Sequence, residues 1–593
     1  ASGGTGAFEV AAASNAVVDV ADLSVVSNGV AGVRIDGLDR LAGAADVDTT
    51  GAPAIDVANV GNGTSSFTFG DVDASNGAGA GVAFVNAAGS YAFDALAITN
   101  TGGTGLGATG SGTLTVRGSG NTIDTSDAAA LALTDTAIGG DGLTFESIDA
   151  GGGGTAANGI VLDNTGAGGL TVNGSDGGDA DTDPDVGSGG TISATTGAGI
   201  RLADARDVEL NGMVVQGTGA SGITGTGLSA ATPGSGNNAF TYAFGDIRDA
   251  GDGEDEAAIF LGTSGANNAR DGVTVSNVLF DDYYDRGLYV FNATASADVT
   301  VEQSTFRNAG SASADGGNAS QAVFVDVNDG GAAASGRVDL TVTDSTFGQP
   351  VGGAVDSICC DAIDFNAQDD GTHTLTVTGS TFQNISNGSS GFGVGSLVTG
   401  ESEMTIDVRD NTFTNVDATN VGLSVGDYAT MTGTIESNTF EGPDIAGVPI
   451  TVVGTGGGLA DASFTGRFRI ENNVAANREH DYALELEAID TSSANATLDA
   501  AVVGNTLTSR GQGLETVHIS ALDGTNVCAD VRNNTIVTDA GSSLSDIGLN
   551  DKASSLVEIA QASEADLSAS NGGASITVLD EVPTYAASCN TPS

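Results

Sequence analysis

The chain of 593 residues has no tryptophan, three histidines, three methionines and one lysine, Lys552, among its 17 basic residues. Against these stand 76 acidic residues, so the formal net charge is −59. Nucleic-acid binding requires clustered basic side chains, so this charge argues against a nucleic-acid partner. It equally opposes docking on an anionic membrane surface.

Long apolar runs are also missing. No stretch approaches 18 consecutive apolar residues, so we expect no transmembrane segment. Residues 1–4 carry neither the charged nor the apolar region of a signal peptide, and we interpret the sequence as a mature secreted chain numbered after signal removal. Hydrophobic residues still make up 40% of the chain and recur regularly, which argues against disorder.

A short motif repeats through the second half. The triplet Ser/Asn-Thr-apolar begins at Ser304, Ser345, Ser380, Asn411, Asn438, Asn472 (as Asn-Asn-Val), Asn505 and Asn534. Its apolar positions lie 27 to 41 residues apart, and a looser version with steps of 20 to 26 residues runs through the first half. A regular period of this size is typical of a repeat architecture, in which each unit packs only on its neighbours.

The segments between these triplets look like β-strands. Residues 112–116, 340–343 and 375–378 are short, rich in Thr, Val and Leu, and mostly alternate apolar with polar. Gly, Asn, Asp and Ser bound them, as expected for turns. We therefore predict an all-β chain that forms a right-handed parallel β-helix, or β-solenoid, of about 20 coils with a small C-terminal cap. Ser, Thr and Asn at the repeated turn would form hydrogen-bonded ladders along the axis.

The length of the steps predicts three segments. Residues 1–245 would form a solenoid of shorter coils, and residues 246–540 would form longer coils with loop excursions. Residues 541–593 would be the C-terminal capping module.

Three sequence features resemble a known family. They are Gly-Ser-Gly-Asn-Thr-Ile at 118–123, Asn-Gly-Ile-Val-Leu-Asp-Asn-Thr at 158–165, and the Ser/Asn-Thr-Phe series. They are similar to right-handed parallel β-helix proteins such as pectate-lyase-like proteins and autotransporter passengers. Within these, the chain resembles the long β-strand-repeat surface proteins of Gram-negative bacteria over about residues 70–593. The resemblance implies an architecture and a surface location, and it says almost nothing about activity.

The four cysteines are an even number, which favours disulfides. Cys528 and Cys589 lie in the last part of the chain, where the segment also resembles the ends of the surface proteins, and we predict that they pair. Cys359 and Cys360 are adjacent; they form a vicinal disulfide, stay reduced, or bridge to another subunit. A secreted or cell-surface location follows from this cysteine interpretation.

Two acidic runs are candidate calcium sites. The denser one places a carboxylate at nearly every second position, at Asp176, Asp179, Asp181, Asp183 and Asp185. The second contains Asp252, Glu254 and Asp255. Calcium takes six to eight oxygen ligands, and crowded carboxylates repel one another without a cation. A solvated acidic loop is the alternative at both places, and calcium is the one cofactor that the sequence suggests.

The most aromatic stretch contains Tyr283 and Tyr284 between acidic residues, a composition typical of carbohydrate contacts. Ordinary packing at a corner is the alternative. Asp369, Asp370 and His373 resemble a catalytic carboxylate group only superficially, since Asp-Asp-Gly also forms a turn before a strand. His480 and His518 have no triad partners in the sequence.

We therefore expect an extracellular structural protein, not an enzyme, whose solenoid stacks end to end with other copies into a surface filament, appendage or coat. A monomeric adhesin that binds carbohydrate or another surface is the main alternative. A polysaccharide lyase or hydrolase is less favoured, because lyase chemistry on acidic sugars needs basic side chains that this chain has in small number.

Overall fold

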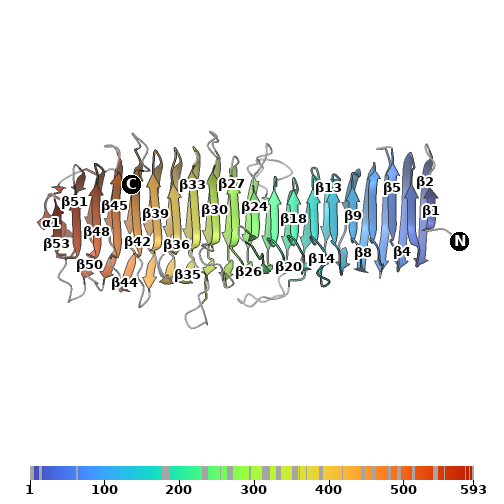
Figure 1. Cartoon of the computed structure of the whole chain (residues 1–593), viewed down its shortest axis with the longest axis horizontal. Helices are drawn as coiled ribbons and strands as arrows, with labels where there is room; N and C mark the ends of the chain where they lie inside the picture. Colours follow the sequence, from blue (N-terminus) through green and yellow to red (C-terminus); the bar gives the residue numbers. More distant parts are fainter. Residues whose placement is uncertain are drawn as a thin grey trace. The chain divides into compact units, whose positions relative to one another are not determined.

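The computed structural model of the chain describes residues 6–11, 16–61, 64–75, 77–175, 187–229, 238–253, 256–262, 271–292, 296–309, 321–328, 336–349, 358, 361–368, 370–385, 391–416, 419–441, 448–456, 463–478, 482–490, 496–509, 515–538, 545–552, 555–580, 583–585 and 588–589. The chain divides into two compact units, Ala1–Tyr284 and Asp285–Ser593. Within each unit the described strands stack side by side in chain order (Figure 1).

In the first unit every coil contributes one strand to a set that we call sheet A. These strands are β1 (Gly6–Ala11), β3 (Ala31–Asp36), β5 (Ile55–Val60), β7 (Val82–Ala87), β9 (Leu106–Thr109), β12 (Leu131–Thr134), β15 (Ile160–Asp163), β18 (Ile200–Ala203), β21 (Ile223–Thr226) and β24 (Ala257–Gly262). Neighbouring coils pair in parallel, as in Ile160 with Ile200 and Ile200 with Ile223.

The remaining strands of the first unit form sheet B. They are β2 (Val17–Asn28), β4 (Arg40–Thr50), β6 (Ser66–Ser75), β8 (Ser90–Thr101), β10 (Thr113–Val116), β11 (Thr122–Thr125), β13 (Ala137–Phe145), β14 (Ser147–Ala150), β16 (Gly169–Asn173), β17 (Gly190–Ser193), β19 (Arg206–Asn211), β20 (Met213–Thr218), β22 (Asn238–Ala243), β23 (Asp246–Ala250), β25 (Asp271–Ser276) and β26 (Leu279–Tyr283). The first four coils use one long strand here. From β10 onward two shorter strands replace it, and β8 pairs with both β10 and β11.

The second unit repeats the plan. Its sheet A strands are β27 (Arg286–Asn292), β30 (Gln321–Asn328), β33 (Asp361–Gln368), β36 (Phe392–Val398), β39 (Thr419–Gly426), β42 (Ile450–Gly456), β45 (Leu484–Asp490), β48 (Val517–Leu522), β51 (Ile547–Asp551) and β53 (Ile576–Asp580). Its sheet B strands are β28 (Ser296–Glu302), β29 (Thr305–Arg307), β31 (Arg337–Thr343), β32 (Thr346–Phe347), β34 (Thr372–Thr378), β35 (Thr381–Ile385), β37 (Glu403–Arg409), β38 (Thr412–Val416), β40 (Thr430–Glu436), β41 (Thr439–Glu441), β43 (Thr465–Glu471), β44 (Val474–Arg478), β46 (Thr497–Val503), β47 (Thr506–Ser509), β49 (Asn526–Arg532), β50 (Thr535–Thr538), β52 (Leu556–Ile559) and β54 (Thr584–Tyr585).

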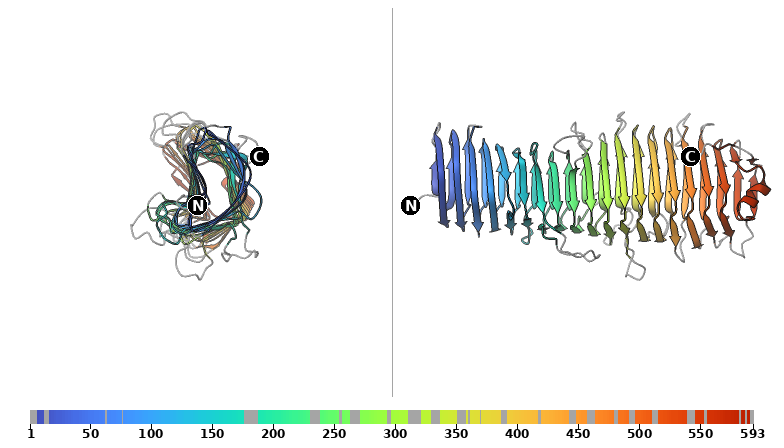
Figure 2. Two further views of the ribbon diagram at one scale, coloured as in Figure 1. Left: turned by 90° about the vertical axis from the view of Figure 1, so that its right-hand side faces the viewer. Right: turned by 180° about the vertical axis from the view of Figure 1, so that it is seen from behind.

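The predicted all-β parallel solenoid is therefore confirmed, with ten sheet A strands in each unit against the expected total of about 20 coils. Its right-handed winding and the three segments 1–245, 246–540 and 541–593 stay predictions. Near the end of the second unit, the helix α1 (Glu564–Ser570) follows β52 in the place where earlier coils have their second sheet B strand (Figure 2).

The repeated triplet marks one corner of the second unit. Its Ser or Asn is buried, and a residue with positive φ comes immediately before it. These preceding residues are Gln303, Asp344, Gly379, Asp410, Ser437, Asn472, Gly504 and Asn533, with φ between 48° and 70°. Asn, Asp and Gly tolerate this left-handed conformation best, which explains their abundance here. The structure corrects one triplet: in the β44 coil it is Asn473-Val474-Ala475, because Asn473 and Ala475 are buried while Val474 is 39% exposed.

Side chains at this corner form a continuous polar ladder in the second unit. Six asparagines stack along it: Asn411, Asn438, Asn473, Asn505, Asn534 and Asn571. Each Nδ2 donates to the Oδ1 of the next asparagine at 2.8–3.0 Å. The same Nδ2 donates to a backbone carbonyl of the preceding coil, as Asn473 does to Ile435 at 2.8 Å. The predicted ladder is thus present, and it satisfies corner backbone groups that the sheets leave free.

At the two ends of the asparagine ladder other groups form the hydrogen bonds. Ser304, Ser345 and Ser380 come before it and accept or donate similar bonds through Oγ. At the other end, Asn571 is the C-cap of α1, and its Nδ2 donates to the carbonyls of Val531 and Leu567. The helix therefore ends the ladder with its own backbone groups satisfied.

Next to the ladder, phenylalanines stack through the interior of five coils. Phe306, Phe347, Phe382, Phe413 and Phe440 have successive ring centroids 4.6–5.1 Å apart, all nearly parallel. Each is 0% exposed. Smaller residues continue the row, with Ala475, Leu507 and Ile536 in register. Burial of these rings is a large part of the apolar stabilisation of the second unit.

Candidate functional site

The calcium hypothesis is tested by only one described residue. Asp176, Asp179, Asp181, Asp183 and Asp185 lie outside the described residues, as do Glu254 and Asp255. Asp252 is exposed, and its backbone N–H donates to Glu256 Oε2 at 2.6 Å. The Gly253 N–H donates to the same oxygen, so the Glu256 carboxylate closes a turn. Within the described part of the chain no three acidic, His or Cys side chains converge as a metal site, and calcium stays a prediction.

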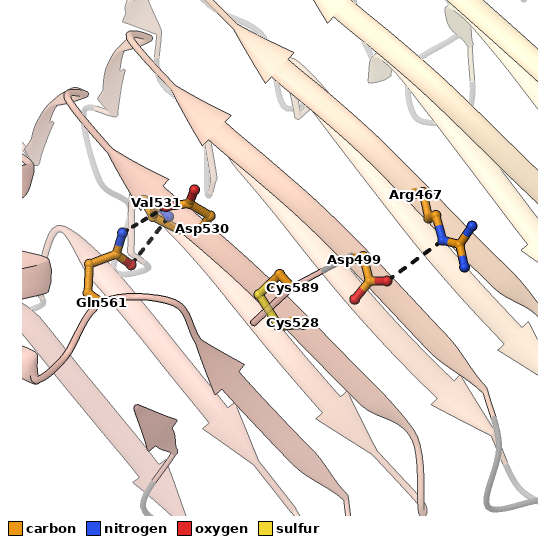
Figure 3. The surroundings of a disulfide bond; sticks show 7 residues. All are labelled: Arg467, Asp499, Cys528, Asp530, Val531, Gln561 and Cys589. Carbon is orange, nitrogen blue, oxygen red and sulfur yellow. Dashed lines mark hydrogen bonds and ion pairs between the residues drawn. A yellow bond between two sulfur atoms is a disulfide. The ribbon is translucent and has the colours of Figure 1, made fainter. Parts of the chain in front are cut away.

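The cysteines near the end of the chain form the expected bond. Cys528 on β49 and Cys589 are joined by a disulfide that spans 61 residues (Figure 3). Cys528 is 5% exposed and in register with Asp499 on β46, which faces Arg467 at 3.9 Å. The disulfide ties the last described segment to sheet B of the second unit. Cys359 and Cys360 lie outside the described residues.

Removing this disulfide will destabilise the second unit. Replacing both Cys528 and Cys589 by Ser should lower the free energy of unfolding by about 2–4 kcal/mol, because a loop of this length is no longer closed in the unfolded chain. Urea denaturation followed by circular dichroism measures the change. Ser588→Ala is the matched control, since it alters an exposed neighbour and should change little. Equal stability of the double variant and wild type would contradict the expected role.

The two candidate tyrosines differ in position. Tyr283 is 1% exposed at the end of β26, and its hydroxyl has no hydrogen-bond partner among the described residues. Burial, with a smaller effect of Asp281, raises its pKa well above 10.0. Tyr283 therefore belongs to the interior of the coil and offers no exposed ring. Tyr284 is half-buried and is the ring of the pair that solvent reaches, so carbohydrate contact there stays a prediction.

The Asp-Asp-Gly-Thr-His segment is built as a turn and a strand. Asp370 is exposed, whereas His373 is 0% exposed on β34 and accepts a hydrogen bond from the Val338 N–H through Nδ1 at 3.2 Å. Its ring lies 5.9 Å from that of Phe365. His373 thus serves as a core residue that satisfies a backbone donor. Asp369 and His480 lie outside the described residues.

His518 belongs to a polar group that the sequence did not single out, on the outer face of sheet A in the second unit. On β45, Leu484, Leu486 and Ala488 face the interior at 0% exposure, so Glu485 and Glu487 between them face outward. His518 and Ser520 on β48 are in register with these two glutamates. The next strand, β51, places Asn550 beside Ser520. Adjacent strands lie about 4.8 Å apart, so these side chains share one patch.

Glu515 completes this patch, which we call the Glu485 cluster: Glu485, Glu487, Glu515, His518, Ser520 and Asn550. Glu515 lies over Gly548, where a Cβ would meet the Glu515 carboxylate at 2.3 Å. Its Oε2 is 3.9 Å from His518 Nδ1. The Tyr482 ring stacks on the imidazole, with the two ring centroids 4.7 Å apart. Gly548 is therefore required by the close approach of Glu515.

Several polar atoms of the Glu485 cluster are buried without a hydrogen-bond partner among the described residues. Ser520 is 0% exposed and His518 is 8% exposed. Ser520 Oγ, His518 Nδ1 and Asn550 Oδ1 form no hydrogen bond among the described residues. Buried polar atoms normally find a partner, because an unsatisfied one costs about 1–3 kcal/mol. This concentration of three such atoms on adjacent strands marks the cluster as a candidate binding site.

The pKa shifts in the Glu485 cluster also indicate a candidate binding site. Burial, and then the neighbouring Glu487, raise the pKa of Glu485 to about 6, although a Thr451 hydroxyl partly offsets them. Burial also raises the pKa of Glu487. Burial lowers the pKa of His518, against an opposing effect of Glu515, so the imidazole carries little positive charge near neutral pH. The cluster is rich in acceptors and carboxylates and short of positive charge.

A second desolvated carboxylate lies nearer the start of the unit, on β33. Asp364 accepts hydrogen bonds from Asn366 Nδ2 at 3.2 Å and Gln321 Nε2 at 3.4 Å. Burial, and then Asp361, raise the pKa of Asp364 to about 7. Gln321 also accepts from Arg286, whose guanidinium lies over the Tyr289 ring. These donors occupy the Asp364 carboxylate, so the Glu485 cluster is the better candidate for a ligand.

The sequence contains a weak signal for the cluster. Glu485 and Glu487 alternate with apolar residues, which places them on one face of a strand. Outward charges on a strand are ordinary, however, and the residues that meet them, His518 and Ser520, are 33 residues later. Only the register between coils brings them together.

Comparison of the chain with protein-family models, with curated proteins and with solved structures found no match. The helix of the described residues, α1, has seven residues, and nothing in that part of the chain is a helix able to cross a bilayer.

Proposed function

We propose that this protein is an extracellular structural protein whose solenoid edges pair with further copies to build a surface filament or coat. The observation that supports this most is the β1–β2 edge. Among the described residues, β1 pairs only with β3 and β2 only with β4. Among the described residues each of these strands therefore pairs along one side, and such a strand edge is the usual template for adding another strand.

The side chains of this edge are consistent with a further coil on top. Phe8 and Val10 on β1 are half-buried, while their register partners one coil in, Val33 and Ile35, are each 1% exposed. The same contrast holds on β2, where Val18 is half-buried and its partner Leu41 is 0% exposed. Burying these positions as fully as their equivalents requires a further layer of strands on this edge.

A second copy supplies the complementary edge. At the other end of the described strands, β53 pairs with β51 and β54 with β52 on one side each. Parallel strands present different hydrogen-bonding sides at the first and last coil, so the last coil of one copy matches the first coil of another. Such head-to-tail contacts do not close and generate a filament.

The net charge and the disulfide indicate the conditions under which copies would assemble. At −59 per copy, end-to-end contact is opposed by repulsion until salt screens it, since the Debye length falls from about 10 Å at 0.1 M to 3 Å at 1 M. The Cys528–Cys589 disulfide persists in oxidising surroundings, which favours a location outside the cell. Assembly should therefore increase with salt.

A pair of variants on β2 tests the proposal. Val20 is half-buried on the inward face, and Ala21 beside it is exposed. Val20→Glu should abolish assembly by placing a charge in the contact, while Ala21→Glu adds the same charge to the outward face and should leave assembly intact. Sedimentation velocity at 0.1 M and 1 M NaCl, with electron microscopy of the same samples, measures the size of the particles. Wild-type protein that stays monomeric at every salt concentration, or equal assembly of both variants, would contradict the proposal.

A further inference from the structure

The outer face of β45, β48 and β51 carries the Glu485 cluster. We propose that the Glu485 cluster binds a ligand bearing a protonated primary amine, such as an amino sugar, through Glu485 and Glu487. Ser520 and Asn550 provide further hydrogen bonds to the ligand. The proposed binding does not require copies of the chain to assemble.

Charge is the first reason for an ammonium group. Glu485 and Glu487 are two residues apart on one strand face, about 7 Å between Cα atoms. Glu515 adds a third carboxylate on the other side of His518, over Gly548 of β51, with 4% exposure. In the described residues none of the three forms an ion pair with an arginine or lysine. Desolvated carboxylates without a counter-ion are unfavourable, and a bound cation relieves this cost.

Hydrogen-bonding capacity is the second reason. Asn550 Oδ1 and the carboxylates are acceptors, and the unpartnered Ser520 Oγ, at 0% exposure, both accepts and donates. An ammonium group presents three donors and no acceptor, which matches this set. A ligand hydroxyl next to the amine would meet His518 Nδ1, the other unpartnered atom of β48. The residues therefore fit an amine with neighbouring hydroxyl groups.

Other ligand classes fit less well. An anion would face three carboxylates, and a neutral sugar would leave their charge uncompensated. A divalent cation needs converging hard ligands, and no group of three or more acidic, His or Cys side chains in the described part of the chain meets that requirement. Glu485 and Glu487 lie on β45 and Glu515 lies over Gly548 of β51, a spread that suits an organic cation whose ammonium group meets the β45 pair.

Titration calorimetry with a charged and an uncharged probe tests the proposal. D-Glucosamine should bind the wild-type protein at pH 7, and N-acetyl-D-glucosamine, which lacks the charge, should bind at least tenfold more weakly. Glu485→Gln and Glu487→Gln should each weaken glucosamine binding at least tenfold, because Gln keeps the shape and removes the charge. Ser520→Ala should weaken it severalfold by removing a hydrogen bond.

The controls separate the site from the net charge of the protein. Glu403→Gln on β37 removes an exposed carboxylate elsewhere in the same unit and should leave the affinity unchanged. The two cluster variants remove desolvated charges, so their melting temperatures should equal or exceed that of wild type and show that they fold. The proposal would be overturned if both sugars bound equally well, or if Glu403→Gln and Glu487→Gln bound glucosamine equally well. It would also be overturned if calcium chloride bound the wild-type protein and this binding was lost in Glu485→Gln and Glu487→Gln.

Proton release gives a readout that does not depend on affinity alone. A bound ammonium favours the ionised form of Glu485, whose neighbours are Glu487 on its own strand, Thr451 on β42 and His518 on β48. Binding of glucosamine at pH 6, where the amine is fully protonated, should therefore release protons, as measured in buffers of different ionisation enthalpy. Glu485→Gln should abolish most of this release at the same pH. Equal proton release by wild type and Glu485→Gln at pH 6 would contradict a role for Glu485.

Discussion

Replacing Asn473 by Ala should lower the free energy of unfolding of the second unit by about 4 kcal/mol. Its side chain takes part in four hydrogen bonds: Oδ1 accepts from the backbone and Nδ2 of Asn438, and Nδ2 donates to Ile435 and Asn505. Each contributes about 1 kcal/mol net, and the buried Asn438 N–H would be left without its acceptor. Urea denaturation measures the change.

The serines of the same ladder supply the control. Ser345 and Ser380 occupy this position in earlier coils, and the Oγ of each accepts from the backbone N–H of the ladder serine one coil before. Asn473→Ser should therefore cost roughly half as much as Asn473→Ala, because it restores the bond that a backbone N–H donates. If the two variants were equally stable, the ladder would not be the source of the effect.

The second large expected effect is that the Asp364 carboxyl group makes the stability of the second unit depend on pH. The pKa of Asp364 is about 7 in the folded protein against an ordinary value of 3.8, because burial and Asp361 disfavour its ionised form. The protonated group thus favours folding below about pH 4, and this contribution is lost as the pH rises through about 7. Over that window the stability of the second unit should fall by on the order of 4 kcal/mol from this group.

Asp364→Asn isolates this contribution. The amide keeps the shape and cannot ionise, so the variant should gain stability over wild type at pH 7.5 and lose the advantage near pH 4. Calorimetric melting temperatures at pH 4, 5.5 and 7.5 show the crossover. Parallel curves for wild type and variant across this range would contradict the assignment.

The sequence predicts the architecture because each residue type of the repeat is suited to one position of the corner. The Ser/Asn-Thr-Phe triplet needs a left-handed residue before it, a buried hydrogen-bonding side chain and a buried ring, and together these define a corner. The β44 coil shows where pattern alone fails. Positions 472 and 473 both hold asparagine, and only the hydrogen bond with Asn438 shows that Asn473 is the one in the ladder.

The candidate site could not be predicted in the same way. Glu485 meets His518 because loops of variable length return the chain to the same register, and no local pattern encodes that length. Tyr283 illustrates the opposite error. Its acidic, aromatic neighbourhood indicates an exposed contact, yet strand alternation places it inside the coil at 1% exposure. Composition identifies a candidate, and the face of the strand decides its accessibility.

Hydrogen exchange at two protein concentrations tests the proposed association most directly. Among the described residues, β1 (Gly6–Ala11) and β2 (Val17–Asn28) pair along one side only. If copies pair through this edge, their exchange should slow at high concentration and high salt, while β5 inside the first unit should exchange at the same rate in both samples. Unchanged exchange of β1 and β2 in particles that sediment as oligomers would place the contact elsewhere and contradict the account.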